Sequence, residues 1–347
     1  MAKKQKRSQT TARRNRNSKK ALPKIVSVFS GAGGLDHGFR SAGFEIVAAF
    51  DISEAAVKTH KRNFPGSNAV AGDLVKLRPV GVAKIVLESI PRGSRIGLIG
   101  GPPCQGFSRA NTRAKATDPR NDLPNLYVRI VKELQKAYEV EFVVFENVLG
   151  MRDKKHAVAY AELIKGLRDL DLDITEKELC ALDFGVPQTR RRIVLAAMRK
   201  GTKRAPVRPR KRKGRSSVRD AIGGFPTPTF FAPKLTEKDI PHHPNHWTMN
   251  PRSARFKSKG VVHNGRSFKQ LKWTKPSPTI AFGHREIYVH PNGRRRLSIF
   301  EAMRLQGFPK GFVLEGNLSE QVEQISNAVP PPLARSVASA IRRTLAA

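Results

Sequence analysis

The sequence predicts an α/β protein with a Rossmann-like, doubly wound and mostly parallel sheet. From residue 24 to residue 198, short apolar runs alternate with stretches of helical periodicity. This alternation favours parallel strands joined by crossover helices. The residues suited to chemistry follow the apolar runs, and ligands of such sheets bind at the carboxyl ends of the strands. A length of 347 residues fits one large domain with a smaller one attached.

The expected strands are six apolar runs. They cover residues 25–29, 45–50, 69–71, 96–99, 142–145 and 193–197. Ser53 follows the second run and is expected to cap the helix after it. Residues 199 to about 295 are rich in Pro, Arg, Lys, Phe and His and predict a smaller, irregular region. Helices are expected again at residues 299–306, from residue 319, and at residues 333–345, where prolines open the last one.

The charge indicates a polyanionic partner. The chain has 65 Lys and Arg against 28 Asp and Glu, a formal charge of +37, and nucleic acid is the expected partner for such an excess. Residues 1–20 hold nine cations and no acid, and residues 199–296 hold 25 cations and four acids. The first segment could be a disordered solubilising arm or an arm that clamps DNA. The second is expected to face nucleic acid, with a solvated surface as the alternative.

The composition excludes several classes of protein. We find no apolar run near the roughly 18 residues that a membrane helix needs, and the basic start is not expected to be a signal peptide. Only two cysteines occur, which excludes a disulfide scaffold and indicates a reducing compartment. No Cys/His cluster has the spacing of a zinc site, so no metal is expected.

The first motif is a glycine-rich turn after the first strand, Ser-Val-Phe-Ser-Gly-Ala-Gly-Gly-Leu at residues 27–35. Such a turn lets the backbone approach a ligand closely. Asp51, after the second strand, could accept hydrogen bonds from two ribose hydroxyls, or it could interact favourably with a helix N-terminus. Asp73, after the third strand, could bind an adenine amino group or belong to a turn. Nothing here calls for a diphosphate, so an adenosine cofactor without one fits best.

The second motif surrounds Cys104 in Gly-Gly-Pro-Pro-Cys-Gln-Gly-Phe-Ser at residues 100–108. A structural cysteine is normally buried among apolar neighbours. Cys104 instead lies in a polar, glycine-rich turn after a strand, between a rigid Pro-Pro pair and Gln-Gly, which indicates a nucleophile. Cys180 alternates with its neighbours as a strand residue does, so we expect it to pack in the core.

Two further motifs supply groups for acid–base and anion chemistry. Glu146 ends a buried strand, where a carboxylic acid can hold its proton at neutral pH and donate it to a ring nitrogen; a structural role is the alternative. In Gln-Thr-Arg-Arg-Arg at residues 188–192, the two-residue period of an extended chain puts Arg190 and Arg192 on one face and Arg191 on the other. The first two could approach a substrate phosphate or base, or the run could be a solvated surface.

Together these residues resemble the DNA (cytosine-5) methyltransferase family, over roughly residues 24–198 and 276 to the C-terminus. Six blocks occur in the family's order: residues 29–34, Pro-Pro-Cys-Gln at 102–105, Glu-Asn-Val at 146–148, Gln-Thr-Arg-Arg-Arg at 188–192, Arg-Leu-Gln-Gly-Phe-Pro at 304–309 and Gln-Ile-Ser-Asn-Ala-Val-Pro at 324–330. Two positions depart from the family pattern. Ser326 stands where glycine is usual, and Ala328 stands where serine is frequent.

The resemblance implies a class I methyltransferase fold with S-adenosyl-L-methionine as methyl donor. Catalytic roles fall to Cys104, Glu146, Arg190 and Arg192. The cofactor pocket would be lined by Phe29, Gly31, Ala32, Gly34, Asp51, Ile52, Asp73, Leu74, Leu123 and Asn327. It also implies a catalytic domain at 23–198, a target-recognition domain at 199–318 and a C-terminal segment at 319–347 that returns to the catalytic domain. The charge distribution adds a basic, disordered tail at residues 1–22.

The implied reaction is methylation of cytosine C5 in a specific duplex DNA sequence, by a monomer of a prokaryotic restriction-modification system in the cytoplasm, at the nucleoid. Cys104 would add to C6, Glu146 would protonate N3 and Arg190 would assist at O2, with the target base flipped out of the stack. Residues 107–120 could close over the DNA as a lid. A tRNA cytosine-5 methyltransferase and a catalytically inactive DNA-binding protein are the alternatives.

Overall fold

The computed structural model describes residues 21–103, 122–201, 206–212, 214, 216–257, 268–280 and 288–346. The basic tail at residues 1–20, the expected nucleophile Cys104 and the expected lid at residues 107–120 lie outside these ranges. Among the helices of the described ranges, none combines the length and the apolar character needed to cross a bilayer.

A seven-stranded sheet forms the centre of the molecule, with strand order β3-β2-β1-β4-β5-β8-β6. The first five strands in this order are parallel, and β8 runs antiparallel between β5 and β6. Their bounds are Lys24–Val28 (β1), Ile46–Asp51 (β2), Asn68–Ala71 (β3), Arg95–Gly100 (β4), Glu139–Asn147 (β5), Leu172–Cys180 (β6) and Arg191–Arg199 (β8). The predicted fold class is confirmed. All six expected strands are present, and β6 is added to them.

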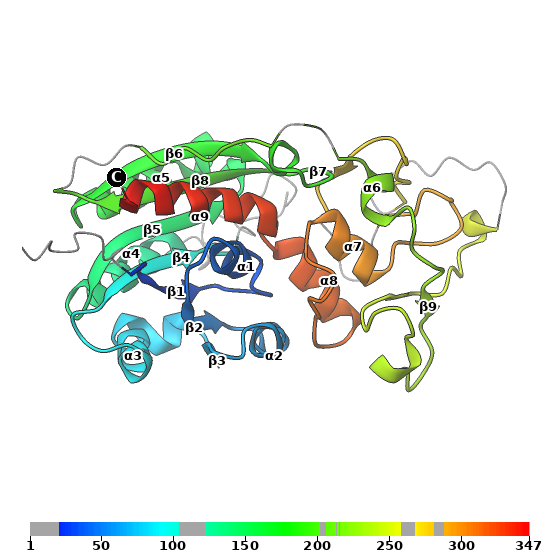
Figure 1. Cartoon of the computed structure of the whole chain (residues 1–347), viewed down its shortest axis with the longest axis horizontal. Coiled ribbons are helices and arrows are strands. Elements are labelled where there is room, and N and C mark those ends of the chain that lie inside the picture. Colours follow the sequence, from blue (N-terminus) through cyan, green and yellow to red (C-terminus); the bar gives the residue numbers. More distant parts are fainter. Residues whose placement is uncertain are drawn as a thin grey trace, which may run out of the picture.

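Helices cover both faces of the sheet, as a doubly wound fold requires. On one face α1 and α9 share a hydrophobic core with β1 and β5, and on the other face α3, α4 and α5 share a second core. Figure 1 shows α9 lying along the sheet beside α1. The bounds are Gly34–Ser41 (α1), Glu54–Asn63 (α2), Leu74–Ser89 (α3), Leu123–Gln135 (α4), Ala157–Arg168 (α5) and Pro331–Ala346 (α9).

Local sequence signals explain where the helices begin. The Ser53 hydroxyl accepts a hydrogen bond from the Ala56 N–H at 3.3 Å and caps α2 as expected. Prolines stand at the first two positions of α9, where a missing N–H costs nothing. The remaining expected helices are α7 (Ile299–Leu305) and α8 (Leu318–Asn327), both opened by a capping box.

The end of the chain packs against its beginning through a close contact between α1 and α9. A Cβ atom at Gly38 would lie 2.3 Å from the Ala334 Cβ, closer than real atoms come. Glycine at this position therefore lets the two helices approach, and it brings the last residues of the chain onto the first βα unit. The segment around Asn327 is carried with them to the edge of the sheet.

The smaller region, residues 216–318, has little regular structure, as the sequence predicted. Its elements are α6 (Val218–Ile222), α7, β9 (Thr229–Phe230), β10 (Trp247–Thr248), β11 (Ser277–Pro278) and single 3-10 turns, and β11 pairs with β7 (Gln188–Thr189) of the large domain. A buried ion pair supports it: Arg295 donates to both Glu301 oxygens at 2.7 Å. Such a hydrogen-bonded pair fixes the conformation of a region with little regular structure, beside the apolar side chains that this region adds to the core.

The first residues after β8 belong to the large domain by their packing. Val207 is buried in the core beneath α9, and its N–H donates to the Thr175 hydroxyl of β6 at 3.3 Å. Residues 206–212 therefore cover the outer edge of the sheet. We propose that the catalytic domain extends to Arg212, beyond the expected boundary at residue 198.

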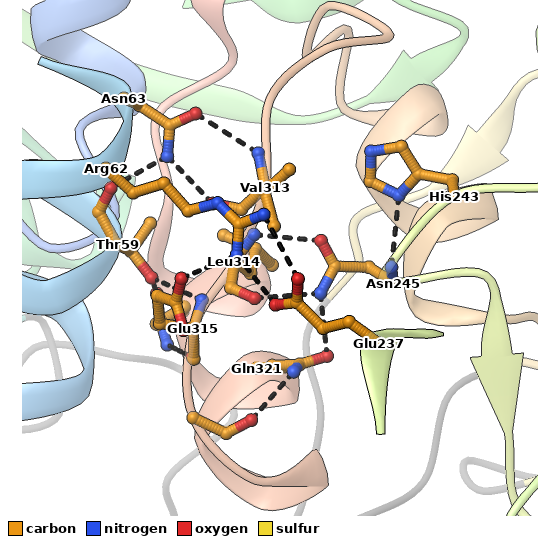
Figure 2. A network of polar contacts seen from close by, with 12 residues as sticks. Thr59, Arg62, Asn63, Glu237, His243, Asn245, Val313, Leu314, Glu315 and Gln321 are labelled. Carbon is orange, nitrogen blue, oxygen red and sulfur yellow. Dashed lines mark hydrogen bonds and ion pairs between the residues drawn. The ribbon is translucent and has the colours of Figure 1, made fainter. Parts of the chain in front are cut away.

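A polar network joins the large domain to the smaller region (Figure 2). Arg62 of α2 pairs with Glu237 of the smaller region at 2.6 Å and with Glu315, which precedes α8, at 2.7 Å. The Asn245 side chain of the smaller region donates to the backbone carbonyl of Leu314 at 2.8 Å and to the side-chain oxygen Oε1 of Gln321 at 3.2 Å. Because Gln321 lies on α8, the smaller region is hydrogen-bonded to the same helix that ends at Asn327.

The expected role of Cys180 was wrong. It ends β6 as a half-buried residue, and Leu179 is the side chain that joins the core. The strand and its alternation were recognised at this end, but the buried side of the alternation was assigned wrongly. Cys180 shares a face with Glu176 and Glu178, whereas Leu179 on the opposite face reaches the core.

Candidate active site

A cavity of about 570 Å³ opens at the carboxyl ends of β1, β2, β4 and β5, with α8 forming one wall. Its volume is in the range of sites for small molecules and cofactors. Expected cofactor residues that line it are Phe29, Gly31, Gly34, Asp51, Ile52, Asp73, Leu74, Leu123 and Asn327. Ala32 does not line it; its side chain is 1% exposed and packs in the core under α1.

The glycine-rich turn is held by Asp51. The Gly31 N–H donates to Asp51 Oδ2 at 2.7 Å, and the Ser53 N–H donates to Oδ1 at 2.9 Å. Phe29 and Gly31 adopt left-handed backbone conformations, with φ of 54° and 52°. A non-glycine residue in this region stores strain that clusters at ligand sites. The carboxylate thus joins the ends of β1 and β2 and keeps further acceptor capacity at the cavity wall.

Burial raises the pKa of Asp51, and the hydrogen bonds from Ser53 and Gly31 oppose the shift. Glu323 of α8 adds to the rise because it places a second negative charge nearby. A cationic or hydroxyl-bearing ligand in the cavity would relieve this repulsion.

Asp73 begins α3, where its Oδ1 accepts the Val75 N–H at 2.9 Å. Asp73 therefore forms a turn and caps a helix, which was one of the two roles expected from the sequence. Because it also lines the cavity, the other role, a ligand contact, stays open. Two large apolar side chains are left exposed beside it, Ile52 at 69% and Val75 at 59%. Both line the cavity, so a flat apolar ring bound between them would cover surface that water now contacts.

The wall formed by α8 was only partly anticipated from the sequence. Asn327 was expected there, but Glu320, Glu323 and Gln324 line the cavity as well. The acids of the cavity wall are Asp36, Asp51, Asp73, Glu146, Glu320 and Glu323. Six acids among the 28 of a chain with charge +37 form a local excess of negative charge. The sequence signal that could have predicted this wall is the pair of nearby glutamates, Glu320 and Glu323, in an otherwise basic chain.

Gly34 sets the distance between this wall and the glycine-rich turn. A Cβ atom at Gly34 would lie 2.3 Å from the Val329 carbonyl oxygen. Glycine therefore permits the block around Asn327 to close the cavity next to Phe29. The two blocks lie some three hundred residues apart in the sequence, yet they line one cavity.

Glu146 ends β5 at the far side of the cavity and is 6% exposed. A Cβ atom at Gly101 would lie 3.0 Å from Glu146 Oε2, and the neighbouring Asn147 amide donates to the Pro102 carbonyl at 3.2 Å. These contacts hold the loop at residues 100–103 against the end of β5. Cys104 follows in the sequence and lies outside the described residues.

Arg192 of β8 is the charged partner of Glu146. Its Nε lies 3.0 Å from Glu146 Oε1, and the two side chains are 11% and 8% exposed. Burial raises the pKa of Glu146, and the positive charges of Arg192 and Arg190 only partly counter this rise. The protonated acid is therefore favoured to a higher pH than in an exposed glutamate.

Arg190 occupies a different position from Arg192. Its guanidinium is 1% exposed and donates to the carbonyl oxygens of Ile280 at 3.2 Å and Ser326 at 3.0 Å. It thereby ties β7 and β8 to the smaller region and to the end of α8. Arg191 points to solvent and pairs with Glu178 at 3.0 Å, so only this middle arginine fits the description of a solvated charge.

The comparisons with known proteins agree with this geometry. The family model for C-5 cytosine-specific DNA methylase matches residues 23–343. The chain is 32% identical to type II methyltransferase M.MthTI of Methanothermobacter thermautotrophicus, covering 92% of this chain and 97% of that protein. It is 33% identical to type II methyltransferase M1.HphI of Haemophilus parahaemolyticus, covering 91% and 86%.

Solved structures give the same fold. A DNA modification methyltransferase encoded within an Escherichia coli prophage superposes with a TM-score of 0.78 at 26% identity, covering 94% of this chain and all of that one. The Dnmt2 methyltransferase of S. pombe superposes with a TM-score of 0.64 at 19% identity. With the match to the family model over nearly the whole chain, these likenesses mean that the chain belongs to the C-5 cytosine-specific DNA methylase family.

Proposed function

We propose that this enzyme transfers a methyl group from S-adenosyl-L-methionine to C5 of a flipped-out cytosine in a specific duplex DNA sequence, through a covalent bond between Cys104 and C6. The observation that carries the proposal is the buried Glu146–Arg192 pair, packed against the loop that leads into Cys104. A proton donor, a fixed cation and a nucleophile would then surround one ring.

The cavity suits S-adenosyl-L-methionine, which supplies an electrophilic methyl group on a sulfonium when bound. Asp51 offers acceptors for ribose hydroxyls, and the exposed Ile52 offers an apolar surface for the adenine. The sulfonium and the amino group of this ligand are both cationic, and the acids of the cavity wall complement them. The absence of a phosphate-cradling lysine from the residues lining the described cavity fits a cofactor without a diphosphate.

Cys104 would attack as a thiolate at C6, forming the S–C6 bond and placing an electron pair on the ring. Glu146 would donate its proton to N3, so that the ring becomes an enamine whose C5 is nucleophilic. We assign the charge developing at O2 to Arg192 and not to Arg190. Arg192 already contacts the acid that serves N3, whereas Arg190 is engaged by backbone carbonyls.

After methyl transfer to C5, the C5 proton must leave to a base and the S–C6 electrons must return to Cys104. Glu146 would recover its proton from N3 in the same elimination. Because the cavity walls enclose Glu146, a cytosine reaches it only after leaving the base stack, at a cost of a few kcal/mol. The basic smaller region would hold the duplex and choose the site, as the modification half of a restriction-modification system.

A methyl-transfer assay with tritiated S-adenosyl-L-methionine tests the proposal. Unmethylated plasmid DNA and total tRNA serve as the two substrates, and the labelled nucleoside is identified by mass spectrometry. We expect 5-methylcytosine in the DNA alone. Label in tRNA alone would replace the proposal with a tRNA methyltransferase, and no label in either polymer would point to a binding protein.

The covalent step is tested on duplexes that carry 5-fluorocytosine. Fluorine at C5 leaves no proton to remove, so elimination is blocked and the protein should stay attached to the DNA through heat and detergent. An enzyme that methylates DNA but is released from such duplexes would contradict the covalent intermediate while leaving the overall reaction intact.

A further inference from the structure

The large domain has a strongly basic outer face away from the cavity. It consists of the segment at residues 206–212 and the exposed side of α9, and we call it the α9 face. Its exposed cations are Arg208, Arg210, Lys211, Arg212, Arg335, Arg342 and Arg343. None of these seven lines the cavity, so the site described above does not account for them.

The α9 face is held by specific contacts and is not a loose charge run. The Ser336 hydroxyl of α9 donates to the Arg210 carbonyl at 3.0 Å, and the Arg343 guanidinium donates to the Arg208 carbonyl at 3.0 Å. Val207 anchors the segment in the core. The carbonyls of Arg208 and Arg210 face α9, while the cationic side chains of this segment remain exposed.

The positive charge of this face is almost uncompensated. Among the described residues, Lys211 alone of the seven pairs with a carboxylate, that of Asp183 at 2.9 Å. Helix α9 contains no Asp or Glu along its whole length. Clustered positive charges repel one another and destabilise the folded chain unless a polyanion neutralises them. We therefore expect an anionic partner at the α9 face.

The first described residues of the chain lie beside this face. A Cβ atom at Gly43 would lie 3.3 Å from Arg342 Nη1 and 3.8 Å from Leu22 Cδ1, so Leu22 and the α9 cation are neighbours. The twenty residues before Ala21 carry nine cations and no acid. The described part of the chain therefore begins next to a cation of the α9 face.

The size of the face fits a duplex. The four residue steps from Arg208 to Arg212 can span up to about 13 Å, and α9 advances about 12 Å from Arg335 to Arg343. Duplex DNA carries about seven negative charges over the same axial length. We infer that the α9 face binds a second segment of duplex DNA, without sequence preference, while the cavity side holds the segment being methylated.

Stoichiometry tests this inference on the full chain. The protein is titrated with fluorescent duplexes of about 14 base pairs at low salt, where phosphate contacts are strongest, and the species are resolved by sedimentation velocity. We expect two duplexes per chain for the wild type. One duplex per chain at saturation would overturn the inference.

A matched pair of triple variants locates the second site. Arg208→Gln, Arg210→Gln and Arg212→Gln together should leave one duplex per chain, or lower the salt slope of log K for the second duplex by about 2.7. The control replaces Lys84, Lys132 and Arg168, exposed cations of α3, α4 and α5 on the opposite side of the sheet, with glutamine. It removes the same charge and should still bind two duplexes. Equal losses in both variants would contradict a located site.

Two further measurements keep the test decisive. Arg335→Gln changes only α9 and should lower the same slope by about 0.9, so it covers the case in which the triple variant fails a thermal melting check. Polyglutamate of equal charge serves as competitor and should displace the second duplex poorly. Displacement as effective as by unlabelled DNA would reassign the face to acidic proteins. Methylation of a short duplex should stay unchanged in all variants, which separates this inference from the proposed function.

Discussion

The two ends of the cavity contain carboxylates in opposite settings. At one end Asp51 accepts two backbone N–H groups and organises the turn that carries Phe29 and Gly31. At the other end Glu146 is buried against an arginine and the loop before Cys104. Burial raises the pKa of both carboxylates, but backbone N–H donors oppose the rise at Asp51, whereas the charges of Arg192 and Arg190 oppose it at Glu146. The comparison teaches that side chains of similar chemistry take different tasks from the donors that surround them.

The largest effect should come from the nucleophile. Cys104→Ser should lower turnover by about 10⁴-fold or more, because a serine hydroxyl is far less ionised than a thiol near neutral pH. DNA binding should persist, as measured by fluorescence anisotropy. Turnover within tenfold of the wild type would show that Cys104 is not the nucleophile. The proposed covalent mechanism beside Glu146 would then be wrong.

Glu146→Gln should reduce turnover by about 10²- to 10⁴-fold, because glutamine can still donate a hydrogen bond to N3 but cannot deliver a proton. In the wild type, burial raises the pKa of Glu146. The wild-type rate should therefore fall as the pH rises through that pKa and Glu146 loses its proton. The variant should lack this alkaline limb in a pH profile of kcat.

The control for this variant is Glu141→Gln. Glu141 lies on the same strand, is also buried, and is 2.8 Å from Arg95, but it does not line the cavity. It should lower thermal stability and leave the pH profile unchanged. If both variants remove the alkaline fall in rate alike, that fall does not report the ionisation of Glu146.

Asp51→Ala should weaken S-adenosyl-L-methionine binding by about 10- to 150-fold, the loss expected for charge-assisted hydrogen bonds of roughly 1.5–3 kcal/mol. Calorimetry measures the cofactor affinity, and DNA affinity should change little. Glu54→Ala is the matched control, because this exposed acid begins α2 nearby without lining the cavity. Unchanged cofactor affinity in Asp51→Ala would show that the carboxylate only organises the turn.

The smallest effect is expected from the second cysteine. Cys180 is half-buried at the end of β6 and does not line the cavity, so Cys180→Ser should alter turnover and melting temperature little. It isolates the loss seen in Cys104→Ser as a property of one sulfur. A collapse of activity in a folded Cys180→Ser protein would mean that both cysteines take part in the reaction.

The sequence by itself determined the alternation of strands and helices and the residues at the carboxyl ends of the strands. These features could be predicted because the spacing of apolar residues, and the glycines and prolines that end an element, depend only on a few neighbouring residues. Ser53 as a cap, the prolines that open α9, and the opposite faces of Arg191 and Arg192 were readable for this reason. The strand β6 was recognised only at its end, around Cys180, because the charged residues that precede this end obscure the apolar alternation.

Only the tertiary structure decided which distant residues meet. Arg190 and Arg192 are equivalent in a two-residue period, yet one is engaged by carbonyls of Ile280 and Ser326 and the other reaches Glu146. The acids of α8 join Asp51 because Gly34 and Gly38 allow the end of the chain to pack on its beginning. Such contacts depend on how segments far apart in the chain pack together, and a local sequence pattern does not show which segments will meet.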